Sequence, residues 1–163
     1  MKTICRLLVC LAVAGAVAWS SRAVASGRSV GDIEQLMKGA SKVVVATADA
    51  VEPQWKRNSF GDQLIVSQVH LKVEETLQGA ADGDLSMEIE GGTLNGVTMV
   101  VSSQQGVAAG ERGVFMLDES TSDSTYVPHF KGLGILKLNR SNRVQGSGVS
   151  LDVIRGLARQ ASK

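Results

Sequence analysis

The stretch that decides the fold is QVHLKVE, residues 68–74, in which polar and apolar residues alternate. Successive side chains of an extended strand point to opposite faces, so this segment has one apolar and one polar face. The segment LSMEIE, residues 85–90, repeats the pattern. We predict two antiparallel strands, each with one face toward the core and one toward water. The residues expected to face the core are Val69, Leu71, Val73, Leu85, Met87 and Ile89. Those expected to face water are His70, Lys72, Glu74, Ser86, Glu88 and Glu90.

Outward from these strands, the pattern predicts more short strands and a helix at each end of the chain. A β-branched run predicts a strand over 42–51, and residues 52–61, with Pro53 and Gly61, are expected to form a connection. Asn95-Gly96 between extended segments is typical of a type I′ hairpin. Further strands are expected at 99–102, 113–118, 126–130 and 133–139, and helices at about 29–40 and 150–161. The glycine pair Gly91-Gly92 is interpreted as a bend.

These elements together predict a mainly β fold, a small antiparallel OB-like barrel of five or six strands with a short N-terminal and a C-terminal helix. Alternating apolar positions favour antiparallel pairing, and closure into a barrel hides the sheet edges. Residues 26–163 are expected to form this single domain.

The first 25 residues have the pattern of a cleaved signal peptide. Lys2 and Arg6 precede an apolar run, and Ala23-Val24-Ala25 offers the small residues that a signal peptidase needs. The alternatives are a membrane anchor, for which the run is short, and lipidation at Cys10, where Val9 is bulky. We therefore expect export to the periplasm or the extracellular space, with no membrane attachment after cleavage.

Removal of the leader would leave a mature chain without cysteine and with uneven charge. Cys5 and Cys10 both precede residue 26, which excludes disulfides, thiol catalysis and cysteine metal sites. Three of the 17 basic residues lie in the leader, which leaves 14 against 16 acidic residues, a net charge of −2. Seven basic residues and one acid follow residue 125. We expect this basic segment to lie against the acidic part of its own chain or in solvent, rather than to bind nucleic acid or another acidic partner.

The chain resembles a known group of proteins between about residues 40 and 138. The valine-rich strand and Trp55 are followed by VEETLQG (73–79), Gly91-Gly92, Gly110-Glu111-Arg112 and the strand 114–117. This order is similar to small exported bacterial proteins of unknown function, whose barrel resembles the netrin-like OB fold of tissue inhibitors of metalloproteinases. Those inhibitors chelate the protease zinc through an N-terminal cysteine, which this mature chain lacks. The resemblance implies a netrin-like OB barrel. As for function, it implies at most a partnership with a secreted protease.

No catalytic constellation emerges from the sequence, and no cofactor or metal site is predicted. The alternative is a metal-dependent hydrolase that uses His70, Glu74 and His129, the scarce residue types that bind zinc. Strand residues four apart are roughly 13 Å apart at the Cα, so His70 and Glu74 are poorly spaced for one ion. We therefore expect a non-enzymatic binding module.

The expected binding face joins the connection after the valine-rich strand to the Asn95-Gly96 hairpin. Its residues are Trp55, Lys56, Arg57, Phe60, Leu94 and Asn95. Trp55 and Phe60 are expected either to fold back and plug one end of the barrel, the preferred interpretation, or to stand exposed as binding anchors. The partner expected is a secreted or envelope protein.

Overall fold

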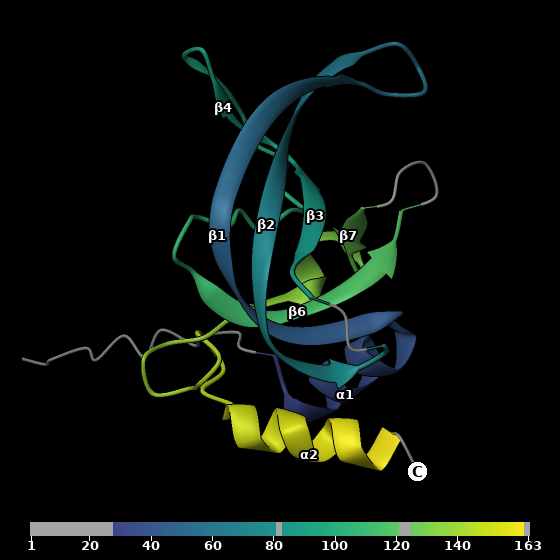
Figure 1. Cartoon of the computed structure of the whole chain (residues 1–163), viewed down its shortest axis with the longest axis vertical. Coiled ribbons are helices and arrows are strands. Elements are labelled where there is room, and N and C mark those ends of the chain that lie inside the picture. Colours follow the sequence, from purple (N-terminus) through teal and green to yellow (C-terminus); the bar gives the residue numbers. More distant parts are fainter. Residues whose placement is uncertain (1–27, 81–82, 121–124, 162–163) are drawn as a thin grey trace, which may run out of the picture.

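The computed structural model describes residues 28–80, 83–120 and 125–161 and confirms a mainly β fold with a helix near each end (Figure 1). The predicted signal peptide lies outside the described residues. The elements are α1 (Val30–Gly39), β1 (Lys42–Arg57), β2 (Gln63–Gln78), β3 (Leu85–Glu90), β4 (Gly92–Leu94), β5 (Val97–Met99), β6 (Arg112–Glu119), β7 (Tyr126–Pro128), the 3-10 turn η1 (Lys131–Gly134), β8 (Ile135–Lys137) and α2 (Leu151–Ala161).

Strands β1 and β2 form one long antiparallel hairpin, which rises as a curved arm to the upper end of the molecule (Figure 1). The expected connection over 52–61 is wrong in extent, because β1 continues through Pro53 and Trp55 to Arg57. Among the described residues, no strand pairs with β1 on its other edge beyond Thr47. A proline there removes no ladder hydrogen bond, so Pro53 does not end the strand. The turn itself is short and is held by Asn58, whose Oδ1 accepts hydrogen bonds from the backbone N–H groups of Phe60 and Asp62.

The predicted register of β2 and β3 is confirmed. Val69 lies opposite Met87 and Leu71 opposite Leu85, and all four side chains are buried. On the other face Lys72 is exposed, whereas Glu88 is half-buried and its carboxylate accepts hydrogen bonds from Lys56 Nζ at 2.9 and 3.0 Å.

The strands close into a ring in the order β1, β2, β3, β7, β6 and back to β1, with β8 added on β6. All these pairings are antiparallel except that of β3 with β7, a single parallel pairing of Met87 with Tyr126. The strand expected over 133–139 is shorter and begins at Ile135, because Lys131–Gly134 form η1 instead. Gly132 explains this difference: its backbone packs directly on Gln105 and donates a hydrogen bond to the Ser103 carbonyl at 3.0 Å.

Strands β1 and β6 lie between two apolar clusters. One fills the ring and includes Val44, Leu71 and Phe115, and the other joins the outer face of these strands to α1 and α2. The valine-rich run is therefore buried on both faces along its first half, which explains why it reads as continuously apolar. The predicted helices are confirmed: Ser29 caps α1 in a capping box with Asp32, and Ser150 Oγ accepts a hydrogen bond from the Val153 N–H.

The basic C-terminal segment pairs with acids of its own chain. Arg155 of α2 lies 2.7 Å from Glu75 of β2, and Lys137 lies 2.7 Å from Glu111. Burial raises the pKa of Glu111, but hydrogen bonds from Lys137 and from the Ala108 N–H outweigh it and hold this pKa below its usual value. The pKa of Glu74 is lowered in the same way: burial raises it, and hydrogen bonds from Arg112 and Thr47 lower it by more.

Candidate binding site

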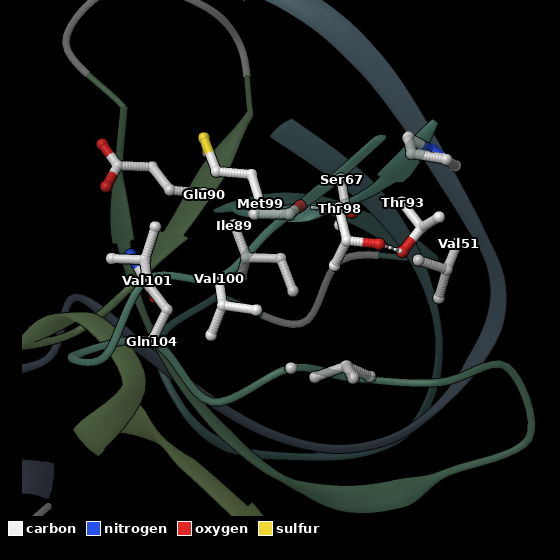
Figure 2. A pocket seen from close by; sticks show the side chains of 15 residues that line it. Val51, Ser67, Ile89, Glu90, Thr93, Thr98, Met99, Val100, Val101 and Gln104 are labelled. Carbon is white, nitrogen blue, oxygen red and sulfur yellow. Dashed lines mark hydrogen bonds between the residues drawn. The ribbon is translucent and has the colours of Figure 1, made fainter. Parts of the chain in front are cut away.

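A hollow of about 450 Å³ lies between the β1–β2 arm, the β4–β5 hairpin and the loop that follows β5 (Figure 2). Its walls come from five strands and this loop, so residues from 51 to 107 meet there. Figure 2 shows Val101 and Gln104 on one side and Val51, Thr93 and Thr98 on the other. Most of the lining is apolar, and the volume lies within the range of roughly 300–1,000 Å³ that is common for small-molecule sites.

Gly91 and Gly92 build the inner wall of the hollow. Both have a positive φ, 106° and 138°, a conformation that strongly favours glycine. The Gly91 carbonyl accepts a hydrogen bond from Ser67 Oγ at 2.8 Å, and its N–H donates to the Ile65 carbonyl at 2.8 Å. A Cβ at Gly92 would lie only 2.5 Å from Ser67 Oγ. The glycine pair thus lets the chain leave β3, pack against β2 and enter the hairpin.

The β4–β5 hairpin has the predicted turn and presents a different side chain pair on each face. Asn95 and Gly96 have φ values of 52° and 79°, as a type I′ turn requires. Thr93 and Thr98 are opposite each other, line the hollow and share a hydroxyl–hydroxyl hydrogen bond of 2.9 Å. Leu94 and Val97 form the next pair, and by strand alternation they lie on the other face of the hairpin. The hairpin therefore separates the hollow from a second, outer face.

The polar groups of the hollow include hydrogen-bond acceptors and donors, because Thr93, Thr98 and Gln104 belong to the lining. Ser67 Oγ donates its hydrogen to Gly91 and keeps its lone pairs. Gln104 Oε1 is buried and has no hydrogen-bond partner among the described residues. Glu90 contributes a carboxylate, and no Lys, Arg or His belongs to the described lining. The hollow is thus mostly apolar, and its described lining contains no positive side chain.

The aromatic residues of the predicted binding face are exposed, so the plug interpretation is wrong. Trp55 is 46% exposed and Phe60, at the tip of the arm, is 89% exposed. Neither closes the ring, because Leu71, Met87 and Phe115 already fill it. Trp55 lies on the same face of β1 as Val51 and Pro53, which line the hollow, because alternate residues of a strand point to the same side.

The other predicted face residues lie on the same two protrusions. Lys56 is bound to Glu88, and Arg57 ends β1 beside the turn. Leu94 is half-buried in the hairpin, and Asn95 forms its exposed tip. The arm and the hairpin both project from the upper end of the molecule (Figure 1). The sequence analysis did not predict the hollow that both of them line. The one sequence signal for it was Gly91-Gly92, which marks a close approach of the backbone.

The histidines of the hydrolase alternative lie apart. His70 Nδ1 is 3.1 Å from Ser86 Oγ, while His129 is buried with Nδ1 2.8 Å from Asp118 Oδ2. Glu74 is bound to Arg112 at 2.7 Å. Within the described residues, no three His, Cys, Asp or Glu side chains are grouped so that they could hold a metal ion.

A second depression, of about 630 Å³, lies beside α1 and is bordered by the exposed Phe130 and Leu133. The charged residues at its rim already have partners, because Asp32 is bound to Ser29 and Arg28 donates to the Ile135 carbonyl. We take the hollow as the candidate site, because its lining residues Val51 and Pro53 lie on the same face of β1 as the exposed Trp55 of the predicted binding face.

The comparisons with known proteins identify no family for this chain: no protein-family model matches it, and no curated protein matches it. Neither helix of the described chain is long and apolar enough to span a membrane.

Proposed function

We propose that the protein is an exported, non-enzymatic binding module with a netrin-like OB barrel, which holds an apolar segment of another exported or envelope protein in its hollow. A secreted protease is one such partner, in keeping with the resemblance to metalloproteinase inhibitors. Export is supported by the leader pattern of residues 1–25.

The observation that carries the proposal is the apolar hollow with exposed apolar residues around it. Val100, which lines the hollow with Met99 and Val101, is 83% exposed, and Trp55 lies on the same face of β1 as the lining residues Val51 and Pro53. Exposed apolar groups around a concave apolar centre are typical of protein-binding surfaces. A flat surface with scattered apolar residues would give no such centre.

The test is affinity capture with the purified exported protein from culture supernatant and envelope extract of the source cells. Thr98→Trp places a large ring in the hollow from an exposed position, so the fold should be retained and a stoichiometric partner should be lost. Val97→Trp is the matched control. Val97 precedes Thr98 in β5, is 50% exposed and, by strand alternation, faces away from the hollow.

Capture that is lost with Thr98→Trp and retained with Val97→Trp supports the proposal. Equal capture by both variants would place the contact elsewhere, and no stoichiometric partner for the unchanged protein would contradict the function itself. Circular dichroism spectra of both variants establish that the ring has not unfolded.

A further inference from the structure

We propose that the segment of the partner protein adds to the free edge of β1 as an extended strand, so that the β1–β2 arm gains a third strand. This inference rests on the proposed function, and it names the way in which the segment is held. The observation behind it is the row of backbone N–H and C=O groups on the upper half of β1, on the side away from β2.

The direction of these backbone groups follows from the pairing of β2. Successive residues of a strand direct their N–H and C=O groups to opposite edges. The Ile65 carbonyl accepts a hydrogen bond from the Gly91 N–H, so Ile65 faces away from β1. Val66 therefore faces β1, where it pairs with Gln54, and no register shift interrupts this part of the pairing. By the same alternation, the residues of β1 whose backbone groups point to the free edge are Val51, Pro53 and Trp55.

This edge is open in the part of the chain that the structure describes. The pairing of β6 with β1 ends at Thr47, and the last backbone hydrogen bonds on this side join Ala48 to Gly110 and Glu111. Beyond them, neither a strand nor a loop of the described residues pairs with the edge. A strand edge with unpaired N–H and C=O groups is a template for a further strand. Pro53 points to this edge, so it takes one donor from the edge and none from the pairing with β2.

The edge favours an extended backbone, because its N–H and C=O groups recur every second residue. In this recognition mode the main-chain hydrogen bonds supply affinity, and alternate side chains supply specificity. Side chains opposite Val51 and Pro53 would lie on the face that lines the hollow, so apolar residues fit there. The other side chains would lie beside Glu52 and Gln54, which are exposed. The expected segment therefore alternates apolar and polar residues, with a basic residue near Glu52.

A second copy of this chain is a less suitable occupant than a segment of another protein. If two β1 edges paired with each other, each would bring its own Pro53, and the new ladder would lack two donors. A segment without proline leaves the ladder short of one donor only. The edge is therefore better suited to a different protein than to self-association.

The experiment measures amide hydrogen exchange in the purified exported protein with and without a probe peptide. The probe is an acetylated and amidated peptide of the sequence Lys-Val-Thr-Val-Lys-Val-Thr-Val. In the free protein the N–H groups of Val51 and Trp55 should exchange rapidly, whereas that of Gln54 is protected by β2. Saturating peptide should slow the exchange of Val51 and Trp55 by about tenfold or more and leave Gln54 unchanged. The control peptide carries N-methyl groups on its valines, so it has nearly the same side chains but lacks the donors, and it should have no effect.

Two substitutions change the number of donors on the edge and leave the pairing with β2 intact. Pro53→Val adds an N–H group and should bind the probe about fivefold more tightly, the usual net effect of one hydrogen bond. Trp55→Pro removes an N–H group, and Trp55→Ala is its matched control, because both lack the indole and only the proline lacks the donor. Trp55→Pro should bind about fivefold less tightly than Trp55→Ala. Circular dichroism spectra establish that the variants retain the β fold.

Equal binding by Trp55→Pro and Trp55→Ala would overturn the inference, and so would equal protection by the methylated peptide or no protection by either peptide. Slow exchange of Val51 and Trp55 in the protein alone would also overturn it, because the edge would then be occupied already by the chain itself or by a second copy. The affinity capture is independent of the probe. A captured partner that leaves these two amides unprotected would refute strand addition and leave the binding function standing.

Discussion

Replacement of Gly92 by alanine tests how the wall of the hollow is built. The φ of 138° is unfavourable for alanine and costs about 1–3 kcal/mol. The added Cβ would lie 2.5 Å from Ser67 Oγ, so the serine must rotate and give up its hydrogen bond to the Gly91 carbonyl. That bond contributes about 1 kcal/mol. We therefore expect Gly92→Ala to lower the free energy of unfolding by about 2–4 kcal/mol.

Two other glycines separate the contributions. Gly96 has a φ of 79° and open space around it, so Gly96→Ala should cost only the backbone strain, about 1–2 kcal/mol. Gly106 has neither a positive φ nor a close neighbour, so Gly106→Ala should change stability by less than about 0.5 kcal/mol. Urea unfolding followed by circular dichroism measures all three variants.

The decisive comparison adds Ser67→Ala to Gly92→Ala. If the added Cβ displaces the hydroxyl, the hydrogen bond is already lost, and the second substitution costs nothing further. In the unchanged protein Ser67→Ala should cost about 1 kcal/mol, because the Gly91 carbonyl loses its donor. Equal costs of Ser67→Ala in the two backgrounds would show that the serine and Gly92 are not in contact, and would refute this account of the wall.

The remaining predictions concern the core, the ion pairs and the exposed tryptophan. Leu71→Ala should lower the free energy of unfolding by about 2–5 kcal/mol, because Leu71 is fully buried inside the ring. Lys72 is exposed, so Lys72→Ala should change this free energy by less than about 0.5 kcal/mol. Similar effects of the two substitutions in urea unfolding would contradict the register. The lowered pKa values of Glu74 and Glu111 imply that their ion pairs stabilise the fold at neutral pH and that this stability is lost as pH falls below the usual carboxyl range. The urea midpoint should therefore drop between about pH 7 and about pH 3. An unchanged midpoint in Arg112→Gln would contradict the contribution of Glu74. Trp55→Ala should weaken partner capture while the melting temperature changes little, because the side chain is 46% exposed; unaltered capture would remove Trp55 from the binding face.

The parts of the fold that depend on local pattern could be predicted from the sequence. The alternation in residues 68–74 and 85–90 determined the faces of β2 and β3, because a slip by one residue would bury Lys72. Asn95-Gly96 defined a hairpin turn by backbone conformation alone, and Ser29 with Asp32 defined a helix start. Each of these signals is complete within a few residues.

Features that depend on distant contacts were beyond this reasoning. Whether Pro53 ends a strand depends on whether the far edge of β1 has a partner. Among the described residues that edge has no strand partner beyond Thr47, because β6 begins at Arg112, which pairs with Thr47. Gly132-Leu133-Gly134 became a 3-10 turn because Gly132 packs on the loop at Ser103–Gln105, and nothing local indicates this approach. The hollow was missed for the same reason, since its walls come from five strands and a loop.

The same topology places the candidate site at the edge of the cluster that fills the ring, because Ile89 and Val107 belong to both. The first half of β1 lies between two apolar clusters, while its second half rises beyond the helices with one edge unpaired among the described residues (Figure 1). Val51 and Pro53 of that second half line the hollow together with Thr93 and Thr98 of the β4–β5 hairpin. Thr98→Trp alters the hollow from an exposed position that belongs to neither cluster. A binding defect in this variant, with unfolding unchanged, would arise from the site alone.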